Sequence, residues 1–307
     1  MDQSVYKYER LSSENIHHLI TLFKIVFKKD VSLDFIIKKY DTSFTGKSFL
    51  GHIAFLNNDP IAYGGYIPYK FQYNNSIEIG AQSVDSMAIK EVNGKGIFTH
   101  IYNLNEQLLL SDGIHFAYGF ANQFSEPVFI HKFGWNSQDR MLAFIIHVPT
   151  IPIAKIRNKL GINSVSNRKQ DSLGIRLDQF MNPYNSKDQG YGVYDSAFFK
   201  YKSFNESRIV KLNNIEVWLK TGRILSVGNI GNCTQEEFAG LIDELKYHAK
   251  KMGCNEILFQ FSPSTFQAEY LEQITKPIAA GAICFNNFTS KIPLQNILFA
   301  NSDIDTF

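Results

Sequence analysis

The sequence predicts an α/β (α+β) fold in which helices flank a mixed, mostly antiparallel sheet. Three observations support this prediction. Before residue 90, short strand-like runs separated by turn residues follow one another, as in an antiparallel meander. A Gly-Lys-Gly loop at residues 94–96 then opens a helical pattern. The order strand, helix, strand, helix, strand returns in the last third of the chain, so we expect a second half with the same layout.

The first 90 residues are expected to form a strand, two helices and a three-stranded meander. Ser13 is the expected N-cap of the first helix, and Glu14 lies in its first turn. The apolar residues that follow have helical spacing. In chain order we expect a strand at 4–9, a helix from residue 13, a second helix at 33–40, and strands at 52–56, 61–71 and 77–89.

After the glycine loop, helices and strands are expected to alternate. In chain order these are a helix to about residue 110, a strand at 114–120, a short helix at 125–132 and a strand at 141–148. In the last third we expect strands at 209–220 and 223–227, a helix opened by a capping box at 234–237, a strand at 256–261, a helix at 266–275 and a strand at 282–288.

Composition suggests three segments and excludes several classes of function. Residues 151–207 are rich in Asn, Ser, Gly and Asp, so we expect an irregular connector between a domain at residues 1–150 and another at residues 208–307. The net charge of +2 without a dense Lys/Arg run argues against a nucleic-acid partner. Three widely spaced cysteines, and histidines without ligand spacing, predict neither disulfides nor a metal site. No apolar run approaches the ~20 residues of a membrane span, and no signal-peptide pattern is present, so we expect a cytoplasmic protein.

The glycine loop is the first candidate binding element. A helix N-terminus offers unpaired N–H groups and the positive end of a dipole, and glycines let an anion such as pyrophosphate approach the backbone. The pattern is neither a Walker loop nor a dinucleotide fingerprint. A tight turn before a helix also needs glycines for steric reasons, and that alternative stays open.

The wider string from Asp85 to Phe98 resembles a motif of the GNAT N-acyltransferase superfamily. In that family the loop between the fourth strand and third helix reads Arg/Gln-x-x-Gly-x-Gly/Ala. Asn93 stands at its first place, Gly96 at the central glycine and Phe98 at the last small residue, so only the central glycine matches strictly. The residues at 118–125, with the closing Lys-x-Gly-aromatic at 132–135, are similar to the family's next block. The resemblance covers roughly residues 1–150.

This resemblance implies coenzyme A or acyl-CoA as a co-substrate, bound between two splayed strands within residues 1–150. The implied cofactor contacts are Met87, Ala88, Ile89, Asn93, Gly94, Lys95, Gly96, Ile97, Phe98, Asn122 and Ser125. The backbone of Met87 is also expected to polarise the thioester carbonyl. The last third has no Gly-Lys-Gly loop, so we expect a degenerate GNAT-like half that completes the acceptor cleft without binding a second cofactor.

Acyl transfer to an amine needs a neutral nucleophile, a stabilised thioester oxygen and a proton for the thiolate. Asp85 is the candidate for keeping the amine neutral, although it could instead pair only with the substrate or with a lysine. Apolar residues at 128–130 stand where many relatives carry a tyrosine acid, so we predict no essential thiol-protonating side chain. His131 lies nearby, but a lone histidine on a short helix is more often a surface or packing residue.

The chain is also similar to bacterial acyltransferases that modify nucleotide-linked amino sugars for surface polysaccharide, such as lipopolysaccharide O-antigen. The similarity rests on Asp-x-Met at 85–87, Gly-Lys-Gly-Ile-Phe at 94–98, Gly-Phe-x-Asn at 119–122 and the terminus at 301–307. It implies transfer of an acetyl or longer group, for example 3-hydroxybutanoyl, to the amine of a dTDP- or UDP-linked amino sugar. The implied substrate contacts are Gln82, Asp85, Tyr118, Phe120, Asp303 and Asp305.

Several alternatives remain open at this point. Aromatic residues on an apolar strand are more often core than ligand-stacking residues, and the acidic terminus could be a solvated tail. The acceptor could be a peptide, a protein or a cell-wall precursor that receives an acyl or aminoacyl group. A non-catalytic module that binds acyl-CoA is the third possibility.

Overall fold

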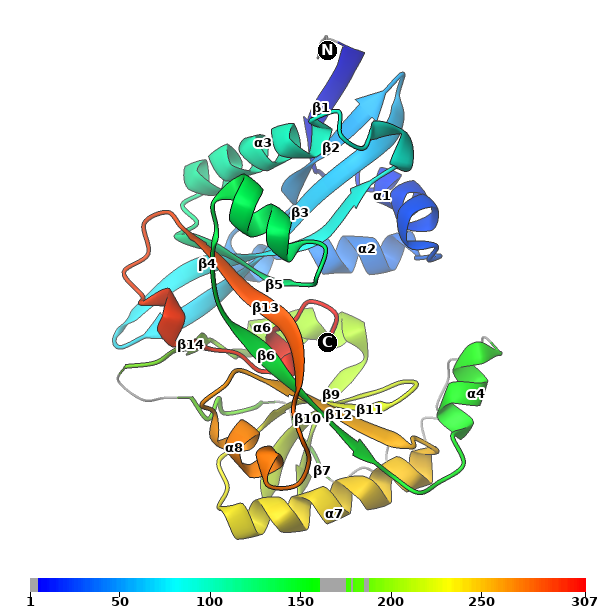
Figure 1. Ribbon diagram of the computed structural model, residues 1–307, viewed down its shortest axis with the longest axis vertical. Coiled ribbons are helices and arrows are strands. Elements are labelled where there is room, and N and C mark those ends of the chain that lie inside the picture. The colour runs from blue at the N-terminus through cyan, green and yellow to red at the C-terminus, as the bar shows by residue number, and fades with distance from the viewer. Residues whose placement is uncertain (1–4, 161–174, 178, 185–187) are drawn as a thin grey trace.

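The computed structural model describes residues 5–160, 175–177, 179–184 and 188–307. One continuous sheet runs through both halves of the chain (Figure 1). The strand order along its main path is β1-β2-β3-β4-β5-β13-β6-β12-β11-β10-β9-β7. Most neighbouring strands are antiparallel and helices flank the sheet, so the predicted fold class is confirmed.

The meander predicted for the first half is present. Its strands are β1 (Tyr6–Arg10), β2 (Leu50–Leu56), β3 (Asp59–Tyr73) and β4 (Ser76–Ala88). α1 (His18–Leu22), continued by a π-helical turn (Phe23–Phe27), and α2 (Leu33–Tyr40) cover one face; α3 (Ile97–Ser111) covers the other. Side chains alternate along β3, so Tyr63 packs under α1 and α2 while Ala62 packs under α3.

The remaining elements alternate between strands and helices. They are β5 (Phe116–Ala121), a π-helical turn (Val128–Lys132), β6 (Asn136–His147), α4 (Ile153–Lys159), β7 (Ile175–Leu177), β8 (Gly190–Gly192), α6 (Ser196–Lys202), β9 (Ser207–Leu212), β10 (Ile215–Thr221), β11 (Leu225–Ile230), α7 (Gln235–Met252), β12 (Glu256–Phe261), α8 (Phe266–Glu272), β13 (Ile278–Asn287) and β14 (Ile297–Leu298). Short 3₁₀ turns lie at Ser43–Thr45, Lys90–Val92, Ser203–Asn205, Leu294–Asn296 and Asn301–Asp303.

Several predicted boundaries differ from the structure, and two of these differences have a local cause. α1 begins at His18 and not at Ser13, because the Ser12 hydroxyl accepts hydrogen bonds from the N–H groups of Glu14 and Asn15 and holds a turn there. The strand expected at 209–220 is the hairpin β9–β10. Its two central residues are asparagines 213 and 214, whose φ angles of 46° and 66° suit a two-residue turn.

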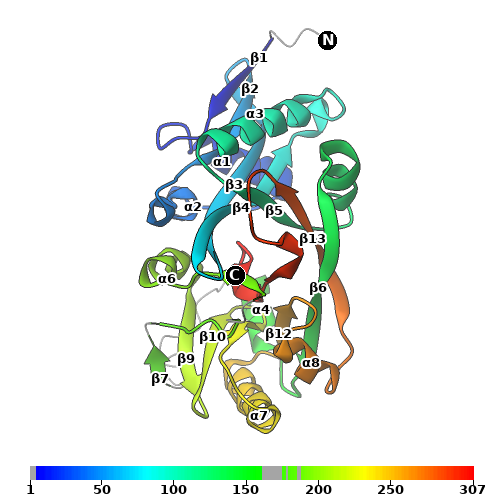
Figure 2. The same ribbon diagram turned by 90° about the vertical axis from the view of Figure 1, so that its left-hand side faces the viewer.

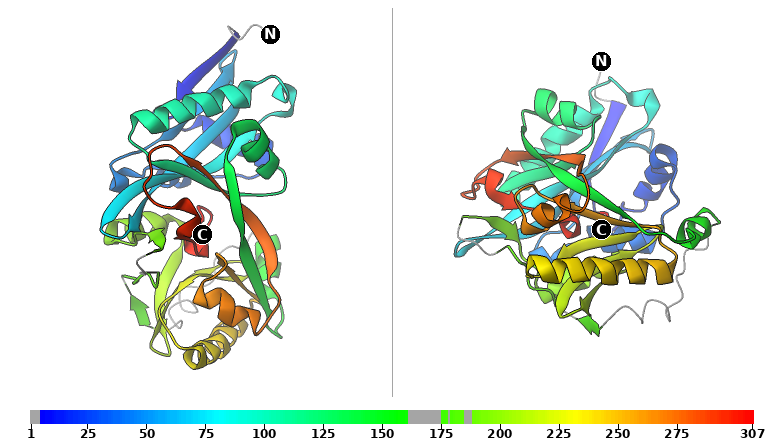
Figure 3. Two further views of the ribbon diagram at one scale, coloured as in Figure 1. Left: turned by 60° about the vertical axis from the view of Figure 1, so that its left-hand side comes forward. Right: turned by 60° about the horizontal axis from the view of Figure 1, so that its bottom comes forward.

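The two halves exchange strands. β13, from the last third of the chain, lies between β5 and β6, and its Cys284 pairs with Gly119 and with Ser137. β6 in turn continues past β13 and pairs Phe144 with Phe259 of β12. Figures 2 and 3 show these two long strands crossing the middle of the molecule. The division into domains at 1–150 and 208–307 with a connector at 151–207 stays a prediction, and the connector region contains α4, β7, β8 and α6.

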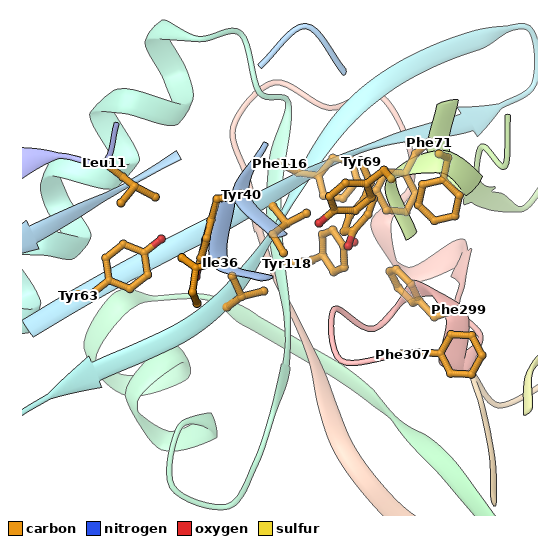
Figure 4. Close-up of a cluster of buried hydrophobic side chains, with 14 of the residues drawn as sticks. Leu11, Ile36, Tyr40, Tyr63, Tyr69, Phe71, Phe116, Tyr118, Phe299 and Phe307 are labelled. Carbon is orange, nitrogen blue, oxygen red and sulfur yellow. The ribbon is translucent and has the colours of Figure 1, made fainter. Parts of the chain in front are cut away.

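The largest buried cluster lies on the α1–α2 side of β3, β4 and β5. Figure 4 shows aromatic side chains gathered from both ends of the chain. The labelled members are Leu11, Ile36, Tyr40, Tyr63, Tyr69, Phe71, Phe116, Tyr118, Phe299 and Phe307. The C-terminal segment is therefore included in the core of the first half.

Candidate active site

β4 and β5 are paired over only three residues and then separate. The parallel pairing joins Gly80–Gln82 to Phe116–Tyr118. Beyond that point β4 continues to Ala88 along β3, while β5 pairs with β13 on its other side. The edge of β4 after Gln82 therefore faces a splay, a gap between strands, as the family resemblance implied.

A β-bulge interrupts β4 inside this splay. Tyr63 pairs with Met87 and Gly65 with Val84, so β4 has one residue more than β3 between these pairs. Asp85 lies in the bulge with φ of +48°, an uncommon conformation for a residue other than glycine. Bulges with such backbone geometry are found next to active sites, where they redirect side chains and N–H groups.

After the bulge, the backbone of β4 presents groups to both edges. The N–H of Ile89 donates to the carbonyl of Ile61 in β3 at 2.9 Å. N–H groups alternate in direction along a strand, so Met87 also faces β3 and the N–H of Ala88 faces the splay. The thioester contact predicted for Met87 is therefore better suited to the backbone of Ala88.

The Gly-Lys-Gly loop ends in an uncapped helix N-terminus. Gly94 and Gly96 have φ angles of +75° and +79°, and open space surrounds the position of a Cβ at either glycine. No side chain caps α3 and no acidic residue lies in its first turn. Because the first helical hydrogen bond runs from His100 to Gly96, the N–H groups of Ile97 and Phe98 have no helical partner. Asn93 and Lys95 are exposed beside them.

A narrow hollow leads along β4 on the α3 side. Ser83 and Ser86 of β4 line it, together with Phe98 and Tyr102 of α3 and Phe133. Tyr102 stacks on Phe133 with ring centroids 3.8 Å apart. The hollow lies between the first turn of α3 and the bulged part of β4.

The closing aromatic of the family-like block has a structural role. Trp135 stacks on Phe129 at 4.3 Å and donates a hydrogen bond from Nε1 to the Tyr102 hydroxyl at 2.7 Å. Phe129, within the apolar stretch 128–130 that sequence analysis singled out, is therefore buried in packing. His131 is exposed.

Asn122 and Ser125 lie at the end of β5, across the splay from β4. The Asn122 side chain accepts hydrogen bonds from the N–H groups of Phe124 and Ser125, at 2.9 and 3.1 Å. The Ser125 hydroxyl accepts from the Asn122 N–H at 3.0 Å. These bonds fix the turn. A ligand would therefore contact mainly the side-chain N–H groups of Asn122 and the hydroxyl of Ser125.

A buried ionic cluster lies on the opposite face of β4. Lys39 of α2 places Nζ 2.6 Å from Asp85 Oδ2 and 2.8 Å from Asp305 Oδ2. The Tyr40 hydroxyl donates to the same Asp85 oxygen at 2.7 Å. The side chain of Lys39 is 5% exposed and each carboxylate side chain is 12% exposed, so water screens these charges little. Burial alone would lower the pKa of Lys39, but Asp305 and Asp85 raise it above its usual value.

Two polar side chains of the splay have no hydrogen-bond partner within the described residues. They are Gln82, through Oε1, and Tyr118, through its hydroxyl, both fully buried. Gln82 and Tyr118 are paired residues at the point where β4 and β5 separate. Burial, followed by the charges of Asp303 and Asp305, raises the pKa of Tyr118 well above its usual value, so its hydroxyl stays protonated. Phe120 packs against Phe299, with ring centroids 5.2 Å apart.

The predicted substrate residues of the C-terminus divide into two kinds. Asp303 is buried and caps the last 3₁₀ turn, since it accepts hydrogen bonds from the Ala300 N–H and the Tyr194 hydroxyl. Burial raises the pKa of Asp303 to about 6. Asp305 instead reaches Lys39. The terminus is thus packed against the core and is not a solvated tail.

Sequence reasoning missed Lys39 and Tyr40, and no local signal could have found them. They sit on a short amphipathic helix whose neighbouring Lys38 has the same chemistry and pairs with Asp34 on the surface. Their functional surroundings depend on residues 46 and 266 positions away.

The second half contains an equivalent strand pair, but the chain itself fills its splay. β11 and β12 pair in parallel over Leu225–Val227 and Ile257–Phe259. The C-terminal segment, residues 297–307, then enters between them, with Phe299 hydrogen-bonded to Ser262 through both backbone groups. At Gly228 a Cβ would lie 2.3 Å from the Phe307 ring. The C-terminal segment, called the plug below, therefore packs tightly in this splay.

The helix that follows this second splay is also closed. Thr234 accepts a hydrogen bond from the Glu237 N–H at 3.2 Å, and the Glu237 carboxylate accepts one from the Thr234 N–H at 2.8 Å. With Glu236, two carboxylates lie in the first turn of α7. An incoming phosphate would meet negative charge and occupied N–H groups there.

Among the residues that the structure describes, no group of three or more His, Cys, Asp or Glu side chains could hold a metal ion. No described helix is both long and apolar enough to cross a membrane.

Comparison with solved structures finds the same architecture in several proteins. A candidate acetyltransferase from Pyrococcus horikoshii superposes with a TM-score of 0.60 at 13% identity, over 95% of this chain and 92% of that chain. A conserved protein of unknown function from Enterococcus faecalis, described as a probable N-acyltransferase, gives 0.61 at 10% identity, over 95% and 74%. A GCN5-related N-acetyltransferase from Kribbella flavida gives 0.57 at 9% identity, over 92% and 71%.

No protein-family model and no curated protein matches the sequence. The likeness therefore rests on structure, and at these identities it concerns the fold. The chain has a GNAT-like fold that covers both of its halves.

Proposed function

We propose that the chain is an acyl-CoA-dependent N-acyltransferase with one cofactor site, in the first half. The observation that carries this proposal is the combination of an open splay at β4–β5 with an uncapped α3 N-terminus at its mouth. An anionic pyrophosphate suits the N–H groups of Ile97 and Phe98, which have no helical partner, and an extended pantetheine arm suits the unpaired edge of β4. The fold neighbours, described as acetyltransferases, are consistent with this use.

The proposed chemistry is direct transfer. The acceptor nitrogen forms a bond to the thioester carbon, the C–S bond breaks, and the proton lost by nitrogen ends on the coenzyme A sulfur, directly or through water. The N–H of Ala88 would stabilise the developing charge on the thioester oxygen. Asp85 would orient the amine and favour its neutral form. Because apolar residues stand at 128–130, where relatives often carry a tyrosine acid, no side-chain acid is assigned to the sulfur.

For the acceptor we propose the amine of a nucleotide-linked amino sugar, with dTDP or UDP as the carrier. Gln82 and Tyr118 offer an unused acceptor and an unused donor beside Asp85, which suits an amino sugar. A groove of about 620 Å³ lies between α2 and α6, and Tyr201, which lines it, donates to the Lys39 carbonyl at 2.9 Å. Aromatic Phe44 and Phe204 with rim lysines 38 and 200 suit a nucleobase and its phosphates.

Two alternatives remain as outcomes of a single experiment. The first alternative is a non-catalytic acyl-CoA-binding module, which the apolar residues around Phe129 favour because they supply no side-chain acid. The second is an acyltransferase whose acceptor is a peptide or a cell-wall precursor, and it would use the same donor site. Calorimetry with coenzyme A, then with UDP- and dTDP-amino sugars, followed by thiol release with acetyl-CoA and longer acyl-CoA, separates the three. We expect micromolar coenzyme A binding, ~8 kcal/mol, and turnover only with amino sugars. Absence of coenzyme A binding by the intact chain would refute the proposal.

A further inference from the structure

The end of the C-terminal segment is fixed by side chains from the second half and the connector. Its main chain accepts four hydrogen bonds, from Lys202 to Ile304 (2.8 Å), from Lys220 to Thr306 (2.6 Å), and from Asn205 to Asp305 (3.1 Å) and Phe307 (2.6 Å). None of these bonds uses the Asp305 carboxylate. That carboxylate therefore remains available for the ion pair with Lys39 of the first half.

The ionic cluster holds one oxygen of Asp85 and leaves the other free. Oδ2 receives both Lys39 Nζ and the Tyr40 hydroxyl. Within the described residues of the chain, Oδ1 takes part in no hydrogen bond, because every hydrogen bond of the Asp85 side chain there ends on Oδ2. A carboxylate held in this way has a fixed orientation and one oxygen without a hydrogen-bond partner among the described residues.

Two carboxylates share the charge of Lys39. Asp305 lies 2.8 Å from the same Nζ that pairs with Asp85, so removing the Asp305 charge would leave Asp85 alone with this cation. A nearby cation favours the ionised form of a carboxylate. The other titratable groups facing the cluster, among the described residues, are Tyr63 and Tyr69 of β3, Tyr118 of β5, Tyr201 and Lys202 of α6, and Lys220 of β10.

We propose that Lys39 and Asp305 are positioning residues for the acceptor amine: Lys39 orients Asp85, and Asp305, brought by the C-terminal segment, holds Lys39 in place and shares its charge with Asp85. This rests on the acyltransferase function proposed above. The same segment therefore has two roles. It closes the second splay and completes the acceptor side of the first.

The test compares Asp305→Asn with the wild type, using acetyl-CoA and an amino sugar. The amide keeps the size of the side chain and can still accept from Lys39, but removes the charge. We expect unchanged coenzyme A affinity, a fall of about 10- to 100-fold in kcat/KM for the acceptor, and an acidic limb of the pH profile that moves to lower pH. Lys39→Arg keeps the cation and should retain most of the activity.

Asn205→Ala is the matched structural control. It loosens the same segment by removing two hydrogen bonds without changing charge, so it should lower the Tm and leave the acidic limb in place. An Asp305→Asn variant with the wild-type kcat/KM and acidic limb would overturn the inference while coenzyme A binding upheld the proposed function. An equal shift of the limb in Asn205→Ala would also overturn it, because the effect would then be structural. Absence of coenzyme A binding by the wild-type protein would overturn both this inference and the proposed function.

Discussion

The two halves use the same strand–helix unit in opposite ways. In the first, β4 and β5 separate around a bulge and the following helix begins without a cap. In the second, β11 and β12 also separate after a three-residue parallel pairing, but Phe299 and Phe307 fill the space and a capping box closes α7. The difference teaches that the splay alone does not define a cofactor site. An available edge and unpaired N–H groups are also needed.

The largest effect is expected at the glycine that distinguishes the open half. Gly96→Leu would place a side chain where the phosphates approach, and we expect coenzyme A affinity to fall by ~1,000-fold, about 4 kcal/mol, in calorimetry. Gly113→Leu is the control at the other end of α3, with φ of +72° and equally open space. Both changes strain the backbone, but only the first should affect binding.

The stoichiometry sharpens the same comparison. Wild-type protein should bind one coenzyme A per chain, so Gly96→Leu should leave no site with the wild-type affinity. A stoichiometry near two, or a residual full-affinity site in the variant, would mean that the plugged splay opens in solution.

Lys202, which donates a hydrogen bond to the plug at Ile304, should make the stability of the protein depend on pH. Burial lowers the pKa of Lys202 to about 7, so between pH 7 and its unfolded value the unfolded chain binds more protons and the free energy of unfolding rises with pH. Lys202→Met should remove this dependence of the free energy of unfolding on pH. The change that is lost amounts to roughly 4 kcal/mol at ~1.4 kcal/mol per pKa unit. Urea unfolding of both proteins at about pH 7, 8.5 and 10 measures the difference. Parallel curves would contradict the prediction.

The bulge residue should affect chemistry and not cofactor binding. Asp85→Asn keeps size and hydrogen bonding, and we expect kcat to fall by ~100-fold, because a positioned base contributes about 10²–10⁴-fold. Coenzyme A affinity should stay unchanged. A variant as fast as wild type at every pH would exclude Asp85 from the mechanism. A large loss in His131→Ala, with folding and binding intact, would show that proton transfer uses a different residue.

The smallest effect is expected at the cap of the closed half. Thr234→Ala should cost about 1 kcal/mol of stability, as for other N-cap threonines, and leave coenzyme A binding unchanged. Thermal unfolding and calorimetry measure the two quantities. Any gain of a second binding event would show that the cap, more than the plug, keeps the second half closed.

Short-range patterns predicted the elements that short-range physics forms. The turn between β3 and β4, the glycine loop and the capping box at Thr234 and Glu237 each depend on residues within a few positions of one another. The strand boundary at Asn213 was missed because two asparagines can adopt left-handed conformations that the alternating pattern around them hides.

Long-range features could not be predicted. β13 is inserted between β5 and β6 by pairing with a strand far away in sequence, and its own pattern is that of any buried strand. The same holds for Lys39, whose partners Asp85 and Asp305 are 46 and 266 positions away. The glycine loop proposed to bind the cofactor was thus accessible from sequence through resemblance, whereas the arrangement of Lys39, Asp85 and Asp305 required the structure.

The exchange of β6 and β13 also constrains when the chain can fold. β5 meets its partner β13 across roughly 160 residues, so the first half cannot complete its sheet until β13 has left the ribosome. Until then β5 has an exposed edge, and the buried pairing that relieves it is of the slow, non-local kind. A fragment ending near residue 150 would remain in that unpaired state, with no Asp305 to reach Lys39. During synthesis, the halves of this protein are one folding unit.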